Sequence, residues 1–156
     1  MHRWTWVIGL ALIFILGADA AAAGNKSEGR IKWITFDEAN QQNQNNLKIM
    51  IFFHADWCMY CHKLEKNAFA DREIADYINT HFLPVRIDTD KDRKTSARFG
   101  VRGLPDIRFL TPEGEGIARI PGYVEGNQFL TLLKFISTDS YKTMSIKDFS
   151  AQQEKK

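Results

Sequence analysis

The chain has 156 residues, of which 44% are hydrophobic and 26% charged, and its basic residues outnumber its acidic ones by 21 to 19. This length fits one domain, the composition excludes collagen-like and wholly disordered proteins, and the near-neutral charge predicts no nucleic-acid partner. Two cysteines are too few for a disulfide-stapled scaffold or for a four-thiolate zinc or iron–sulfur site.

The N-terminus has the three parts of a secretory signal peptide, which we assign to residues 1–23. Residues 1–3 are basic, residues 4–17 are almost wholly apolar, and residues 18–23 offer the small side chains that signal peptidase reads. A membrane-spanning helix needs about 20 apolar residues, and this run is shorter. We therefore expect cleavage, export to the periplasm and no stable membrane insertion of the mature chain. Disulfide bonds form and persist in that compartment.

The first half of the mature chain predicts two helical regions around one buried strand. After a flexible lead-in at 24–32, residues 35–43 open with the T-x-x-E pattern of a capping box and predict a helix. Residues 47–53 are apolar apart from one lysine and predict a buried central strand. A helix is expected from about Cys58, and Asp71 is the expected N-cap of its continuation.

The following segment predicts a strand, a short helix and a β-hairpin. Residues 83–87 alternate between apolar and other side chains, as a strand does. Residues 92–99 predict a short helix that ends at Gly100. A turn-rich connection joins 107–110 to 117–120, which favours a hairpin.

The C-terminal part predicts a closing helix and a polar tail. Apolar residues at i, i+3, i+4 and i+7 over 129–136 predict an amphipathic helix that covers the sheet. The tail, 138–156, is polar, with a docked turn expected near Ile146 and Phe149. The order of elements predicts an α/β domain at 33–137, with a central mixed sheet of four or five strands flanked by helices.

Cys58 and Cys61 form a C-x-x-C pair at the predicted junction of a strand and a helix. A thiol at a helix N-terminus faces unpaired backbone N–H groups and the positive end of the dipole, which stabilise a thiolate. Because the thiolate is the nucleophile of disulfide exchange, Cys58 is the expected attacking group. Cys61, one turn inward, is expected to be shielded and to resolve the mixed disulfide. The predicted site is a redox-active dithiol that needs no metal or cofactor.

Over residues 33–137 the chain resembles the thioredoxin superfamily. The resemblance rests on the strand 49–53, the run 55–61 (ADWCMYC) and the Gly-Leu-Pro segment 103–105 before a strand. The chain is similar to exported thioredoxin-like proteins and to the C-terminal domain of membrane thiol:disulfide interchange proteins. The resemblance implies a thioredoxin-like fold, thiol:disulfide exchange with protein substrates, and a cis Pro105 packed beside the disulfide. Only about 5–6% of X–Pro bonds are cis, so this bond is a sharp test.

A substrate-binding rim and a redox direction follow from the same resemblance. Trp57, Tyr60 and Leu104 are expected to form an apolar rim around Cys58 that holds an extended segment of a protein thiol or disulfide substrate. The uncharged Met59-Tyr60 between the cysteines indicates a middling redox potential. The resemblance favours a reductase, fed by a membrane electron donor, over a strong oxidant.

One departure from the family concerns the proton of Cys61. Thioredoxins carry a buried aspartate six residues before the first cysteine, and Phe52 stands at that position here. Another group must therefore accept the proton. Glu65, on the helix of the cysteines, is the preferred candidate. The other candidates are Asp56, His54 and His62.

Four alternatives remain open for the same residues. Cys58, Cys61 and His62 spell C-x-x-C-H, the attachment motif of c-type haem, although small c-type cytochromes are largely helical and this chain has several strand signals. The two cysteines with His54 or His62 are a candidate zinc site. The pair is also readable as a purely structural disulfide. The fourth alternative is a thioredoxin-like binding or chaperone module without catalysis.

Overall fold

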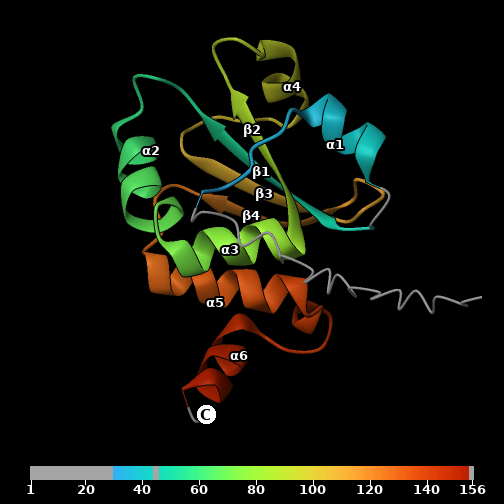
Figure 1. Cartoon of the computed structure of the whole chain (residues 1–156), viewed down its shortest axis with the longest axis vertical. Helices are drawn as coiled ribbons and strands as arrows, with labels where there is room; N and C mark the ends of the chain where they lie inside the picture. Colours follow the sequence, from blue (N-terminus) through green and yellow to red (C-terminus); the bar gives the residue numbers. More distant parts are fainter. Residues whose placement is uncertain (1–29, 44–45, 155–156) are drawn as a thin grey trace, which may run out of the picture.

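A mixed four-stranded sheet forms the centre of the computed structural model, which describes residues 30–43 and 46–154 (Figure 1). The expected signal peptide lies outside the described residues. In the strand order β2-β1-β3-β4, β1 pairs parallel with β2 and antiparallel with β3, and β3 pairs antiparallel with β4. The strands are β1 (Lys48–His54), β2 (Phe82–Asp88), β3 (Asp106–Leu110) and β4 (Gly116–Pro121). The predicted mixed sheet is confirmed, with four strands.

Helices cover both faces of this sheet. On one face lie α1 and α4, and on the other lie α2, its continuation η1, α3 and α5 (Figure 1). The helices are α1 (Phe36–Gln42), α2 (Met59–Leu64), η1 (Glu65–Phe69), α3 (Arg72–His81), α4 (Arg93–Arg98) and α5 (Gly126–Ser137). Because the central strand is covered on both sides, six of its seven residues are buried, which explains the nearly continuous apolar run.

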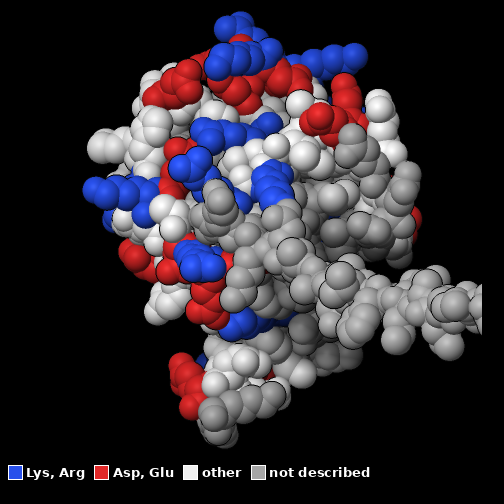
Figure 2. Space-filling view, viewed as in Figure 1, with Lys and Arg blue, Asp and Glu red and all other residues white. Residues whose placement is uncertain are grey.

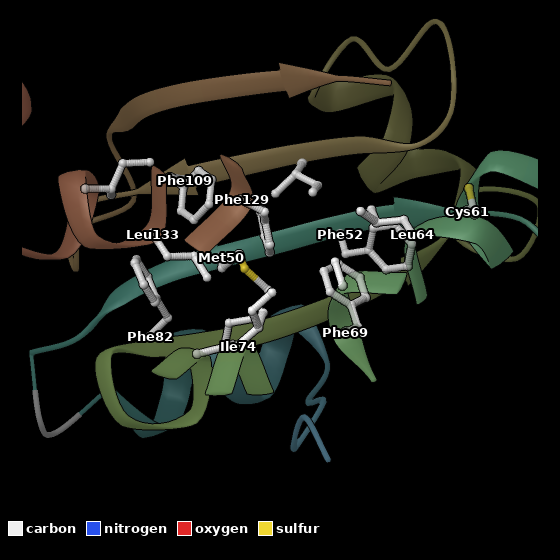
Figure 3. Close-up of a cluster of buried hydrophobic side chains, with 14 of the residues drawn as sticks. Met50, Phe52, Cys61, Leu64, Phe69, Ile74, Phe82, Phe109, Phe129 and Leu133 are labelled. Atoms are coloured by element: carbon white, nitrogen blue, oxygen red, sulfur yellow. The ribbon is translucent and has the colours of Figure 1, made fainter. Parts of the chain in front are cut away.

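Alternate side chains of β1 therefore enter two separate cores. Met50 and Phe52 pack with residues of α2, η1, α3 and α5, whereas Ile51 and Phe53 pack with β2 and α1. The first core is the larger and is rich in phenylalanine (Figure 3). It reaches from Phe82 at one end to Cys61 and Leu64 of α2 at the other, so this well-packed core supports α2 directly.

Three helix starts carry the caps that the sequence predicts. Thr35 accepts from the backbone of Glu38 while Glu38 bonds back to the backbone of Thr35, a complete capping box. Asp71 accepts from the backbone N–H of Ile74 and starts α3. The helix expected from about Cys58 is α2, and Cys58 is its N-cap.

The helix of the cysteines differs from its predicted continuous form. After Leu64 the backbone widens into the π-helical turn η1, in which Ala70 N–H bonds to the carbonyl of Glu65. A π turn inserts one extra residue into the helical repeat, so the apolar spacing beyond it is shifted. The amphipathic pattern of the sequence carries no signal for that insertion.

The C-terminal tail contains a helix where a docked turn was expected. After a short 3₁₀ turn, η2 (Ser140–Lys142), α6 (Ile146–Gln153) begins at the N-cap Ser145. Phe149 is buried, and its ring lies 5.4 Å from that of Phe135 on α5. Within residues 30–43 and 46–154, no helix has both the length and the apolar character needed to cross a bilayer.

Candidate active site

The two cysteines form a disulfide at the N-terminal end of α2. Their Cα atoms lie 5.2 Å apart, and Cys58 Sγ accepts a hydrogen bond from Cys61 N–H at 3.1 Å. The Cys58 carbonyl accepts from the N–H groups of Cys61 and His62, which closes the first turn. The same N–H that reaches the sulfur in the disulfide is therefore placed to stabilise a thiolate on Cys58 after reduction.

Both sulfur-bearing residues are shielded in the oxidised state. Cys58 is 4% exposed and Cys61 is 1% exposed, and both belong to the larger apolar core. The difference in exposure between the two cysteines has the predicted direction, with Cys61 the more buried one, but it is small. The exposed part of the site is therefore formed by the neighbours of Cys58 and not by the cysteines themselves.

Those neighbours are large exposed side chains. Trp57, Met59 and Tyr60 are 70%, 75% and 55% exposed, an unusual concentration of apolar surface beside a buried disulfide. Trp57 is held by a hydrogen bond from its Nε1 to Asp90 Oδ2, 2.9 Å long. Trp57 and Tyr60 were expected at this surface from the sequence, but Met59 was not, although its place between the cysteines was a signal for it.

The Leu104–Pro105 peptide bond is cis, as expected. Leu104 is half-buried and packs against both cores, including the one that holds the cysteines. The Pro105 carbonyl accepts from Gly122 N–H at 2.7 Å, which fastens this loop to the end of β4. The positive φ of Gly122, 82°, favours glycine in this turn. The loop before β3 is thus fixed in place.

Asp106, directly after the cis proline, is fully buried between two arginines. Its carboxylate is bonded by Arg108 Nε at 2.6 Å and by Arg119 Nη2 at 2.9 Å. Arg108 also donates to the Phe99 carbonyl at the end of α4. The ion pairs of Asp106 therefore hold this loop in place, and its buried side chain is not accessible to a substrate.

Phe52 occupies the position at which thioredoxins carry a buried aspartate, so there is no carboxylate at that position. It is fully buried, packs edge-on against Phe69 and stacks on the ring of His54, with centroids 5.0 and 5.4 Å away. His54 is 7% exposed and accepts a hydrogen bond from Arg86 Nε at 2.8 Å. Burial and then the charge of Arg86 lower the pKa of His54, which favours the neutral ring.

Glu65, the preferred proton acceptor, lies one turn beyond Cys61, with its N–H bonded to the Cys61 carbonyl. Arg86 Nη2 lies 2.6 Å from Glu65 Oε1, a close ion pair. Oε2 of the same carboxylate lies 3.6 Å from His62 Nδ1. Arg86 thus links Glu65 to His54.

The four candidates for proton transfer separate into two groups. Glu65, His54 and His62 belong to the chain of contacts around Arg86, on the face of the sheet that also holds the cysteines. Asp56 projects into solvent, with its side chain 82% exposed, and lies 3.7 Å from Lys91. Arg86 was not among the residues expected from the sequence, although a charged residue in a largely buried strand was a signal for it.

Comparisons with known proteins agree with this geometry. A model of the thioredoxin-like domain family matches residues 35–137, well over half of the chain. The thiol:disulfide interchange protein DsbD of Yersinia pestis is 29% identical over 129 residues, which cover 74% of this chain and 22% of that protein. The chain thus spans less than a quarter of that relative.

Two further matches are closer to the chain in size. The disulfide bond reductase DsbH of Chlamydia pneumoniae is 24% identical over 142 residues, covering 74% of this chain and 86% of that protein. A solved structure of a DsbH oxidoreductase superposes with a TM-score of 0.62 at 23% identity, covering 74% of this chain and 87% of that one. That protein and this chain share the same fold. Its central sheet contradicts the alternative of a small c-type cytochrome, which is largely helical. The chain therefore belongs to the thioredoxin-like domain family.

Proposed function

We propose that this protein is an exported thiol:disulfide oxidoreductase that reduces disulfides of periplasmic proteins through Cys58 and Cys61. The observation that carries the proposal is a disulfide at a helix N-terminus whose outer residue is bordered by the exposed side chains of Trp57, Met59 and Tyr60. A structural disulfide needs no such surface, whereas a site that must hold a protein substrate does.

The reaction runs through two exchanges that conserve electrons. The Cys58 thiolate attacks one sulfur of the substrate disulfide, forms a mixed disulfide and releases the other substrate sulfur as a thiolate. Cys61 then loses its proton and attacks Cys58 Sγ, which forms the Cys58–Cys61 disulfide and releases the second substrate sulfur. Two electrons pass from the dithiol to the substrate. The oxidised state of the pair, as in this structure, is the product of that cycle.

Glu65 accepts the proton of Cys61 in this proposal, in place of the absent aspartate at Phe52. Glu65 follows Cys61 by one turn of the helical region, and the ion pair with Arg86 fixes the position of its carboxylate. The neutral His54 is a weaker candidate, because its lowered pKa disfavours protonation.

The rim residues bind the substrate chain. Trp57 and Tyr60, both exposed beside Cys58, provide apolar contact, and the half-buried Leu104 before the cis bond adds to it. The tie between Trp57 and Asp90 lowers the cost of ordering the indole when a substrate binds.

Location and direction rest on the signal-like N-terminus and on the relatives. The Chlamydia pneumoniae relative is named a disulfide bond reductase, and the Yersinia pestis relative is named a thiol:disulfide interchange protein. A membrane electron donor would return the Cys58–Cys61 disulfide to the dithiol after each cycle.

The test is to capture substrates in the periplasm. Cys61→Ser removes the resolving thiol, so mixed disulfides on Cys58 should accumulate and separate from the free protein on non-reducing gels. Cys58→Ser is the matched control and should capture nothing. Equal capture by both variants, or by neither, contradicts the proposal. Full partner binding by a variant with both cysteines changed to alanine would support the binding-module alternative.

A further inference from the structure

Charge is distributed unevenly over this nearly neutral chain. Residues 91–102 hold five basic residues and one acidic residue, whereas the whole chain has an excess of only two. Four of these cations are exposed and have no ion-pair partner in the described part of the chain. We call them the basic surface: Arg93, Lys94, Arg98 and Arg102. At the top of the molecule, where Figure 1 places α4, Figure 2 shows blue side chains with red ones among and directly beneath them.

The basic surface stands on a firmly held element. Asp92 caps α4 by accepting from Thr95 N–H at 2.9 Å, and its carbonyl accepts from Ser96 Oγ at 2.7 Å. Behind the helix, the Phe99 ring lies 5.6 Å from that of Phe36 and 5.4 Å from that of Phe53. The well-packed helix α4 thus holds like charges close together. Their mutual repulsion costs free energy, which an oppositely charged partner would offset.

The same surface adjoins the active site. The carboxyl ends of parallel strands β1 and β2 meet at one edge of the sheet, so α2 and α4, which follow them, both begin there (Figure 1). Lys91, just before α4, lies 3.7 Å from the carboxylate of Asp56, two residues before Cys58. At the other end of the surface, Arg102 precedes the exposed Gly103 and then Leu104, which packs against the core that holds the cysteines.

We propose that the basic surface docks protein partners whose reactive cysteine is flanked by acidic side chains. This inference rests on the proposed function and names its substrate class. Exposed charges act over about 8–10 Å at moderate ionic strength, which is enough to steer a chain that crosses from Cys58 toward Arg102. The apolar rim is indifferent to charge, so the discrimination comes from α4 and the loop that follows it.

The experiment compares three peptide disulfides that differ only in the residues flanking the cysteine: glutamate, glutamine or lysine. The rate constant for their reduction by the reduced protein is measured at low and high ionic strength. At low salt the glutamate peptide should react about tenfold faster than the lysine peptide. The difference should nearly vanish in about 0.5 M salt, because screening shortens the reach of exposed charges.

Two matched variants locate the effect. Lys94 and Lys147 are both exposed and both the second residue of a helix, α4 and α6 respectively. Lys94→Glu should lower the preference for the glutamate peptide at least threefold, and Lys147→Glu should leave it unchanged. Arg102→Glu should act like Lys94→Glu.

The neutral glutamine peptide separates failure of this inference from failure of the proposed function. If that peptide is reduced but the charged peptides react equally, the basic surface has no part in recognition and this inference is wrong. The same holds if Lys94→Glu and Lys147→Glu change the preference equally. If the glutamine peptide is not reduced at all, the proposed function fails as well.

Discussion

The indole nitrogen of Trp57 donates a hydrogen bond to the carboxylate of Asp90, 33 residues further along the chain. Asp90 lies just beyond β2 and Trp57 just beyond β1, so parallel pairing of the two strands brings them to the same edge of the sheet. The most exposed aromatic side chain beside the disulfide is therefore oriented by a different loop.

Removal of this bond should weaken substrate binding more than chemistry. Asp90→Ala should raise KM about two- to threefold and leave kcat within twofold, because a single exposed hydrogen bond contributes at the low end of about 0.5–1.5 kcal/mol. Asp90→Asn keeps an acceptor oxygen and is the control. Steady-state kinetics with a peptide disulfide provide the measurement, and a fall in kcat at constant KM would be inconsistent with the positioning role.

Glu65→Gln should slow the resolving step. Without the carboxylate, solvent must take the proton of Cys61, so turnover should fall at least about tenfold at neutral pH and rise with pH between about 6 and 9. Glu73→Gln, an exposed change on α3, is the control. Rates from a pH series decide the question, and an unchanged rate and profile in Glu65→Gln would remove Glu65 from the mechanism.

Stability should fall as the pH drops from about 7 to 5. Burial lowers the pKa of His54 and of His81 in the folded state, so below the ordinary histidine value of about 6.5 the unfolded chain binds more protons. The stabilisation is present above that value and is lost as the pH falls through the folded pKa. His54→Gln should show a shallower dependence in urea unfolding, and so should His81→Gln. Identical slopes in the wild type and both variants would contradict the neutral state of these rings.

Asp106→Asn should destabilise the fold by about 3 kcal/mol. The change leaves the partly buried Arg108 without its counter-ion, and breaking one side of a buried ion pair costs about 3–5 kcal/mol. Because Arg119 is 43% exposed, we expect the low end of that range. Asp37→Asn, on the surface of α1, should stay within about 0.5 kcal/mol. Urea unfolding of the two variants measures both values, and equal stabilities would be unexpected.

Local signals account for most of what could be predicted. The capping box at Thr35, the buried strand β1 and the helix start at Cys58 each depend on residues close together in sequence, and all three are confirmed. The cis bond before Pro105 came from the family resemblance and is confirmed as well. These features identify the fold and the reacting pair.

The missing parts of the site depend on strand pairing and on small energy differences. Arg86 meets Glu65 and His54 only after β2 pairs with β1, and no local pattern specifies that contact. The segment that forms the π turn η1 has the same residue types as an ordinary α-helix, so the sequence does not indicate the turn. In the tail, α6 depends largely on one buried side chain, Phe149, which is too weak a pattern to distinguish a helix from a turn.

The central claim is that Cys58 attacks and Cys61 resolves, and mass spectrometry of purified single-cysteine variants tests it most directly. Both variants are incubated with an excess of one peptide disulfide at neutral pH. Cys61→Ser should acquire one peptide on Cys58 within minutes. Cys58→Ser should react at least about tenfold more slowly, because its remaining thiol, that of Cys61, is the more buried one and is not at the N-cap of α2. Equal rates for the two variants, or faster labelling of Cys61, would contradict the account.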